Sequence, residues 1–361
     1  PATRPLPGAH PGGDRRRRPF DGILGEVSRR PVVAGMLFMV LVAGFLVVGR
    51  SGRATATPRP PVLGPARTAY DGDLGDPFVL PLTAGGSVTG FVAFGTGDWP
   101  ARIPTARSSD LATWQKGPDA LPDLPGWARS DPKHSLSWAP AVLDAGLGFV
   151  MYVTLPDAGS GQQCIGAAAS KAPDGPYAGV GDGPLLCQHE LGGSIDPAVT
   201  RDGRGGLHLL WKDEANTLGR PSSLWQQALT ADGLGLVGTP HRLLSARSRW
   251  QDKIVEEPAA IPSADGGWWL FYSGNHFDTP GYATGLAYCP DLDGPCRETS
   301  DRPFLTTAGL GVEGQYAPGG LETFRDARGA LWAVLDTWNR PTRDGRFRCC
   351  RSVQLAEILS V

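Results

Sequence analysis

The stretch Asp196-Pro197-Ala198-Val199-Thr200 is one of five similar stretches that divide most of the chain into repeats. Each contains a proline followed by mostly apolar residues, and successive prolines are separated by 63, 57, 61 and 60 residues. A period of this length is typical of repeat architectures, in which each repeat forms one supersecondary unit. The other four stretches are Asp76-Pro77-Phe78-Val79-Leu80, Ala139-Pro140-Ala141-Val142-Leu143, Glu257-Pro258-Ala259-Ala260-Ile261 and Ala317-Pro318-Gly319-Gly320-Leu321.

Two further apolar runs follow each proline stretch within its repeat. The first comes after a glycine-containing gap, as FVAFGTG from Phe91, FVMYVTL from Phe149, LHLLWKD from Leu207, WWLFYSG from Trp268 and LWAVLDT from Leu331. The second is expected at Thr105–Ser108, Ile165–Ser170, Leu224–Leu229, Thr284–Tyr288 and Arg351–Leu355. Such short runs of β-branched, aromatic and aliphatic residues are typical of strands. Five copies of a multi-stranded unit predict an all-β fold, a five-bladed β-propeller over residues 71–361, whereas a β-sandwich gives no reason for a fivefold period.

The composition agrees with a turn-rich β architecture. Glycine and proline supply 50 and 34 of the 361 residues, and charged residues make up only 19%. The 34 basic and 36 acidic side chains leave a net charge of -2, which excludes a nucleic-acid-binding protein that works through bulk positive charge. The charge is uneven, because residues 1–60 carry ten Arg, no Lys and three acidic residues, and so sum to +7.

The N-terminal region has the pattern of a membrane anchor. Residues 31–49 contain no charge and are bracketed by Arg30 and Arg50. As a helix they span about 28 Å, close to the thickness of the hydrocarbon core. Positive charge upstream places residues 1–30 in the cytoplasm as a basic tail, so residues 50–70 are expected as a linker and the propeller as extracytoplasmic at the cell membrane. The alternative is a signal peptide cleaved after Ala54-Thr55-Ala56, followed by secretion.

All six cysteines follow the expected anchor. Cys289 and Cys296 flank a short turn-like segment, and Cys164 and Cys187 bracket the outer part of one repeat, so both pairs are expected as disulfides. The state of the adjacent Cys349 and Cys350 is left open, because a vicinal disulfide is strained. Disulfides agree with an oxidising, extracytoplasmic location.

Carboxylates occur beside three of the five repeated prolines. They are Asp76, Asp196 and the pair Glu256 and Glu257. The innermost strands of a propeller line its central channel, so residues sixty apart in sequence converge there. Convergent carboxylates on rigid strands are a candidate site for acid–base chemistry. The alternative is that each acid only caps a turn.

With these carboxylates in place, the chain resembles glycoside hydrolase family 43, whose members are five-bladed propellers. The resemblance covers roughly residues 71–361, in the order and spacing of the family. It rests on Gly75-Asp76-Pro77-Phe78, Ser137-Trp138-Ala139-Pro140, Ser194-Ile195-Asp196-Pro197, Val255-Glu256-Glu257-Pro258, Ala317-Pro318-Gly319, and the segment Arg107-Ser108-Ser109-Asp110-Leu111 with Trp114.

The resemblance implies an inverting hydrolysis of an arabinose- or xylose-containing polysaccharide, and α-L-arabinofuranosidase is the first choice within it. Asp76 would be the general base that activates water, Glu256 the acid that protonates the leaving oxygen, and Asp196 the residue that orients the acid and adjusts its pKa. The repeat instead aligns Glu257 with Asp76 and Asp196. The two glutamates are not expected to point the same way, because successive strand side chains alternate faces. We assign the acid to Glu256 because the Glu-x-Pro element of the family selects it, whereas the repeat match concerns only scaffold geometry.

Aromatic and polar residues near the channel end are candidates for sugar binding. Trp138 precedes one of the repeated Ala-Pro pairs and is expected to pack against the sugar. Trp99 and Asn275 follow strand ends and are further candidates, whereas His276 is expected in a solvated turn. Trp268 and Trp269 lie in mid-strand and are expected in the blade core.

No cofactor is assigned, because no grouping of His, Asp and Glu has metal-ligand spacing. A central metal ion stays an open question, because many family members have His at the position of Gly320. Gly320, together with Ala141 where relatives place an acid, also supports the alternative of a non-catalytic carbohydrate-binding surface propeller. The expected partners are a polysaccharide or oligosaccharide and the membrane, with no nucleic acid, and the protein is expected to be a monomer.

Overall fold

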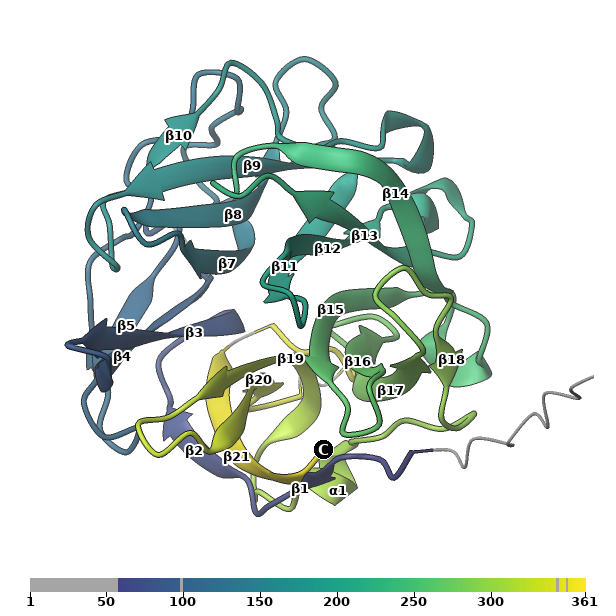
Figure 1. Cartoon of the computed structure of the whole chain (residues 1–361). Helices are drawn as coiled ribbons and strands as arrows, with labels where there is room; N and C mark the ends of the chain where they lie inside the picture. The colour runs from purple at the N-terminus through teal and green to yellow at the C-terminus, as the bar shows by residue number, and fades with distance from the viewer. Residues whose placement is uncertain (1–57, 98–99, 342–343, 349) are drawn as a thin grey trace, which may run out of the picture. The chain divides into compact units, whose positions relative to one another are not determined.

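The computed structural model describes residues 58–97, 100–341, 344–348 and 350–361, which form five antiparallel sheets around a central channel (Figure 1). The first strand of each sheet lies nearest the centre. The prediction of a five-bladed propeller is therefore confirmed. The first three blades are β3 (Gly75–Ala84), β4 (Ser87–Thr96), β5 (Thr105–Ser108) and β6 (Gln115–Lys116); β7 (Trp138–Asp144), β8 (Phe149–Pro156), β9 (Gln163–Ser170) and β10 (Ala178–Val180); and β11 (Ser194–Arg201), β12 (Leu207–Asp213), β13 (Ser223–Leu229) and β14 (Leu236–Ser245).

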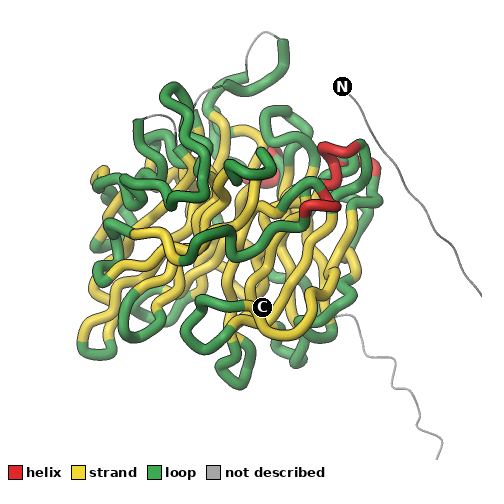
Figure 2. The backbone as a smooth tube through the Cα atoms, turned by 90° about the horizontal axis from the view of Figure 1, so that it is seen from above, coloured by secondary structure: helices red, strands yellow, loops and turns green. Residues whose placement is uncertain are grey.

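The last two blades differ in how they end. The fourth is formed by β15 (Val255–Pro262), β16 (Trp268–Gly274), β17 (Ala283–Cys289) and β18 (Arg297–Glu298). The fifth consists of β19 (Tyr316–Arg325), β20 (Leu331–Trp338) and β21 (Arg351–Ser360), completed by β1 (Val62–Leu63) and β2 (Arg67–Tyr70). Within the described residues, helical segments are limited to α1 (Thr307–Leu310) and three short 3-10 turns. Figure 2 shows the strands running between loops gathered at their two ends.

Part of the segment expected as a linker belongs to the propeller. β1 and β2 both pair with β21 in antiparallel register, with Arg67 opposite Leu355 and Val62 opposite Ser360. The prolines of this segment suggested an extended linker, but proline is compatible with a strand at the edge of a sheet, where no ladder hydrogen bond is lost. The N-terminal strands therefore supply the outer part of the last blade and close the ring.

The core lies between the blades. Because successive side chains of a strand point to opposite faces, each inner strand contributes to two clusters. In β12, Leu209 packs in the cluster shared with the second blade, and Leu210 packs in the cluster shared with the fourth. In β16, Trp269 packs in the cluster shared with the fifth blade, and Leu270 packs in the cluster shared with the third. Burial of both faces explains the continuous apolar runs, and the expectation that Trp268 and Trp269 are core residues is confirmed.

Two disulfides staple the outer parts of blades. Cys164 in β9 is bonded to Cys187, and Cys289 at the end of β17 is bonded to Cys296, as expected. Cys349 lies outside the described residues, so the expectation for that pair is not tested. The same holds for the membrane span expected at residues 31–49, and among the described residues no helix has the length and apolar character needed to cross a bilayer.

Candidate active site

A bulge interrupts the innermost strand of every blade at the repeated proline. The ladder skips the proline and the residue before it, for example between Glu256 and Ala259 in β15. Proline has no N–H to contribute to the ladder, which makes the bulge the natural place for it. The residue before each proline has a positive φ, a conformation that costs of order 1–3 kcal/mol for a residue other than glycine. These residues are Asp76 (47°), Ala139 (45°), Asp196 (55°), Glu257 (50°) and Ala317 (53°).

The bulges direct the carboxylates into one cavity of about 350 Å³ at one end of the channel. Asp76, Asp196, Glu256 and Trp138 all line it, so four residues singled out in the sequence come together. Glu257 lines it as well. The alternation of strand side chains therefore does not separate Glu256 from Glu257, because the bulge lies at this point of β15. The cavity is completed by Thr96, Ile195, Lys212, Glu214, Asn216, Ile254, His276, Phe277, Tyr282 and Arg351.

Asp76 is held as a carboxylate by an arginine from the last blade. Nη1 of Arg351, in β21, lies 2.5 Å from Oδ1 of Asp76 and 3.3 Å from Oδ2 of Asp336. Burial alone would raise the pKa of Asp76, but Arg351 and hydrogen bonds from Glu257 and Thr96 hold it below its usual value. Burial raises the pKa of Asp336 to about 7 in spite of the same arginine. Asp76 is thus the ionised member of this group at neutral pH.

Glu256 and Asp196 lie beside a buried lysine. Nζ of Lys212, which is 3% exposed, contacts Oε1 of Glu214 at 2.8 Å and Oε2 of Glu256 at 3.2 Å. Asp196 accepts a hydrogen bond from the backbone N–H of Glu257 at 3.2 Å. Burial and the neighbouring Glu256 raise the pKa of Asp196 well above its usual value, although Lys212 opposes them. Asp196 therefore favours its protonated form beside Glu256.

Glu257 points toward the channel and has its own set of partners. Its Oε2 accepts hydrogen bonds from the hydroxyls of Ser273 at 2.9 Å and Tyr282 at 2.6 Å. Its carboxyl group is also hydrogen-bonded to that of Asp76. Burial first, and then the charge of Asp76, raise the pKa of Glu257 well above its usual value.

The other expected sugar-binding residues have different outcomes. Trp99 lies outside the described residues. Asn275 is used by its own loop, because its amide donates to the carbonyl of Trp250 at 2.7 Å and accepts from the backbone N–H of His276 at 2.8 Å. His276 is half-exposed, as expected for a turn, yet it lines the cavity beside Phe277. Phe277 is 51% exposed and packs on Trp338 with ring centroids 6.1 Å apart, which places an aromatic face at the mouth.

Sequence reasoning did not find the two cations or the tyrosine. Lys212 ends an apolar strand run and Arg351 begins another, and neither belongs to a motif. Tyr282 follows the loop of Asn275 and His276. The sequence offered one weak signal for the two cations. Each is a basic residue at the channel end of a strand that is otherwise buried on both faces, and a buried basic residue needs a buried acidic partner.

The channel continues past the carboxylates. It narrows to a space of about 20 Å³ lined by Asp76, Asp196, Glu257 and Gly320, and widens to a cavity of about 540 Å³ lined by all five innermost strands. Glu322 of β19 borders both spaces. Burial raises the pKa of Glu322 to about 8, and Thr323 donates its backbone N–H to the carboxylate.

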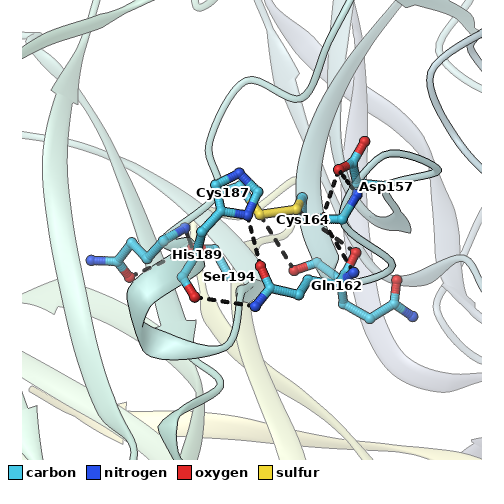
Figure 3. Close-up of a disulfide and its surroundings, with 9 residues drawn as sticks. Asp157, Gln162, Cys164, Cys187, His189 and Ser194 are labelled. Atoms are coloured by element: carbon cyan, nitrogen blue, oxygen red, sulfur yellow. Dashed lines mark hydrogen bonds between the residues drawn. A yellow bond between two sulfur atoms is a disulfide. The ribbon is translucent and has the colours of Figure 1, made fainter. Parts of the chain in front are cut away.

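The described residues do not favour a metal at the channel end. At Gly320, where the resemblance raised the question of a histidine, a Cβ would come within 2.9 Å of Oδ1 of Asp336 and 3.4 Å of Oε1 of Glu257, so a larger side chain would require the Asp336 carboxyl group to shift. Among the described residues, the one set of three metal-ligating side chains whose ligand atoms lie within 4.8 Å of one another is Cys164, Cys187 and His189. Figure 3 shows that its two sulfurs form the disulfide, which removes the thiolate ligands. Nδ1 of His189 is hydrogen-bonded to Gln162 at 2.7 Å.

A five-bladed propeller with buried carboxylates converging on a cavity at the end of its channel defines a class of sugar-cleaving enzymes. The chain matches the family described as "Glycosyl hydrolases family 43" over residues 71–358. The chain belongs to this family, and the protein is a glycoside hydrolase. No curated protein sequence matches the chain.

Solved structures show the same fold. A thermostable family-43 glycoside hydrolase has 23% identity and a TM-score of 0.67, with 83% of this chain and 92% of that chain covered. An endo-1,4-β-xylanase from Bacteroides thetaiotaomicron has 21% identity and a TM-score of 0.63, with 80% and 91% covered. An endo-arabinase from the same organism has 17% identity and a TM-score of 0.63, with 83% and 98% covered.

Proposed function

We propose that the protein is an inverting glycoside hydrolase that releases arabinose or xylose units from a polysaccharide, with α-L-arabinofuranosidase as the leading activity. The observation that carries the proposal is that two carboxyl groups of one cavity have pKa values shifted in opposite directions: the pKa of Asp76 is lowered beside Arg351, and that of Asp196, next to Glu256, is raised by burial and by the charge of Glu256. Pairs of carboxyl groups whose environments push their pKa values apart are the usual arrangement of a base and an acid.

In the proposed reaction, Asp76 accepts a proton from a water molecule as the water oxygen attacks the anomeric carbon. The bond from that carbon to the leaving oxygen breaks, and Glu256 donates its proton to the leaving oxygen. Asp196 orients the acid, since it is coupled to Glu256 and is itself fixed by the backbone N–H of Glu257. Each turnover inverts the configuration at the anomeric carbon and moves one proton from the acid side of the cavity to the base side.

The position of Glu257 supports Glu256 as the acid. An inverting enzyme needs roughly 6.5–9.5 Å between its two carboxyl groups, so that a water and the sugar fit between them. Glu257 is hydrogen-bonded directly to Asp76, which leaves no such space. Glu256 instead contacts Lys212, which is shared with Glu214 on another part of the cavity wall.

The substrate class is supported by shape and by likeness. A cavity of about 350 Å³ is at the small end of ligand sites and suits release of a single sugar. Trp138 in the wall and Phe277 at the mouth offer aromatic faces to a pentose ring. Two of the similar structures are described as a xylanase and an arabinase, both of which act on pentose polymers.

The experiment is a screen of nitrophenyl glycosides and of arabinan, arabinoxylan and arabinogalactan, with the anomer of the first product read by NMR. We expect release of a pentose with inverted configuration, and Asp76→Asn serves as the inactive control. Absence of release from every pentose-containing substrate by folded protein would overturn the proposal. Retained configuration would overturn the single-displacement mechanism.

We also propose that the propeller is tethered outside the cytoplasm by residues 31–49 as an uncleaved anchor, and that it is a monomer. The two disulfides support an oxidising location. The full-length protein is expected in the membrane fraction, with the propeller released by external protease. A mature N-terminus at Thr57 in the medium would show cleavage and secretion instead, and light scattering on the released propeller tests the monomer.

A further inference from the structure

Glu257 is a buried carboxyl group that the proposed reaction does not use. Both of its hydroxyl donors, Ser273 and Tyr282, contact the same oxygen, Oε2. The other oxygen, Oε1, faces the space beside Gly320, 3.4 Å from where a Cβ would lie, and Oδ1 of Asp336 (2.9 Å) and the Cα of Asp76 (3.3 Å) border the same space. The carboxyl groups of Glu257 and Asp76 are hydrogen-bonded to each other. Oε1 is therefore the oxygen left to carry a proton toward Asp76.

The charges around the pair decide which member is neutral. Two adjacent carboxyl groups in a buried site do not both ionise. Arg351 contacts Asp76 directly at 2.5 Å, so the negative charge is stabilised on Asp76 and the proton stays on Glu257. The direction of both pKa shifts agrees, since that of Asp76 is lowered and that of Glu257 is raised. The titratable and charged groups that face Glu257 are Asp76 from β3, Asp196 from β11, Glu256 from β15, Tyr282 ahead of β17, Asp336 from β20 and Arg351 from β21.

Taking the proposed hydrolysis as its basis, we propose that Glu257 is a positioning residue that stays protonated and donates a hydrogen bond to Asp76, which keeps the water-activating carboxylate ionised and in one orientation. The proton of Glu257 is not transferred in the reaction. The proton that Asp76 receives comes from water, and the proton on the leaving oxygen comes from Glu256. The arrangement lets the base remain ionised at lower pH, at the expense of some base strength.

Two variants separate this role from a structural one. Glu257→Gln keeps a donor for Asp76 and an acceptor for the two hydroxyls, so kcat/KM should stay within about tenfold of the parent, with an unchanged acid limb of the pH profile. Glu257→Leu has similar volume but no donor. Its kcat/KM should fall by about 10- to 100-fold, the effect of one hydrogen bond to a charged group. Its acid limb should move up by about one pH unit.

The direction in which the acid limb moves is determined by the base, Asp76. Activity is lost as pH falls through the pKa of Asp76, and removal of a donor raises that pKa, so the loss begins at higher pH. The matched control is Glu322→Gln, a second channel carboxyl group that has a raised pKa and borders the same narrow space, but whose pKa is not shifted by Asp76; this variant should leave the limb in place. An acid limb in Glu257→Leu that matches the parent would overturn the proposal, as would a limb that shifts equally in Glu257→Gln.

A second measurement does not need activity. Infrared difference spectroscopy of the parent near neutral pH detects protonated buried carboxyl groups, and the spectrum should lose one such band in Glu257→Gln. If the parent hydrolyses no substrate but Glu257→Gln still loses this band, the proposed function is refuted, whereas the proposal that Glu257 is protonated is upheld. An unchanged carboxyl band would show that Glu257 is ionised, and the proposal would then be wrong even if Glu257→Leu fails to fold.

Discussion

The two sides of the active-site cavity use the same components to opposite effect. On one side Arg351 lies between Asp76 and Asp336, with Glu257 next to Asp76. On the other side, Lys212 lies between Glu214 and Glu256, with Asp196 close by. Each side thus has one buried cation among three carboxyl groups, so neither can ionise fully.

The difference is which carboxyl group keeps the charge. On the Arg351 side the protons favour Glu257 and Asp336, which flank Asp76 and leave it ionised. On the Lys212 side the pKa of Asp196, the neighbour of Glu256, is raised, so a proton stays close to the proposed acid. Arg351 contacts the proposed base and Lys212 contacts the proposed acid. The comparison therefore teaches that a buried cation does not by itself select base or acid, and that the neighbouring carboxyl groups matter as well.

The largest expected effect comes from removing the charge at the centre of the Arg351 side. Asp76→Asn should lower kcat by about 10²- to 10⁴-fold, because an amide at this position cannot accept the proton of the attacking water. The measurement is kcat and KM on the best substrate, with a melting curve to show that the fold is intact. Activity near that of the parent would show that another residue is the base, and would contradict the assignment of the Arg351 side as the base side of the cavity.

The next effect tests the Lys212 side. Glu256→Gln should lose about 10²- to 10³-fold on polysaccharide, where the leaving group needs a proton, and much less on activated aryl glycosides. Measuring both substrates with both variants, and with Glu257→Gln beside them, identifies the acid. If Glu257 proves indispensable and Glu256 tolerant, the internal repeat and not the Glu-x-Pro element marks the acid.

Exchanging each cation for methionine should move opposite limbs of the pH profile. Arg351→Met raises the pKa of Asp76, so the acid limb moves to higher pH by about one unit and activity near pH 5 falls about tenfold. Lys212→Met raises the pKa of the carboxyl groups that hold the acid's proton, so the alkaline limb moves to higher pH. Profiles of kcat/KM check both, and a shift of the same limb in both variants would contradict the division into two sides.

Lys212→Met should also destabilise the fold, by about 3–5 kcal/mol near neutral pH, because carboxylates are left buried without a cation. With raised pKa values the folded state binds more protons than the unfolded state, so stability falls as pH rises above the ordinary carboxyl pKa. Urea unfolding at pH 5 and pH 8 should therefore show the larger deficit at pH 8. Equal deficits at the two pH values would show that lost packing of the lysine stem is the cause.

The smallest expected effect concerns Glu322, a buried carboxyl group without a neighbouring cation among the described residues, which serves as a reference for the two sides of the cavity. Glu322 has a raised pKa of about 8, so above its unfolded value it binds more protons when folded, and stability declines as pH rises from about 4.5 to 8. Glu322→Gln removes this decline. Its melting temperature should equal that of the parent near pH 4 and exceed it by about a few degrees at pH 9. A constant difference across this range would show that Glu322 does not titrate in the channel.

The fold and the main carboxylates were predictable because they depend on periodicity. The spacing of the prolines was enough to place Asp76, Asp196 and the pair Glu256 and Glu257 at one channel end, and the apolar runs marked the strands. The choice of Glu256 within that pair came from the family resemblance and not from the spacing. The bulge was not predictable from a two-residue alternation, since it appears only as a positive φ at Glu257 and its equivalents. Arg351 was beyond reach because its partner Asp76 lies 275 residues away, and no local pattern connects them.

The pairing of β1 and β2 with β21 has a consequence for biogenesis. Arg67 pairs with Leu355, so ring closure must wait until β21 has been made and is a long-range event for which loop-closure entropy must be overcome. Until then the outer edge of the last blade is open to pairing with another chain. A nascent chain that is stalled or cut before β21 would expose an unpaired strand edge of the last blade. Ring closure is therefore the step at which cellular quality control has most exposed edge to recognise.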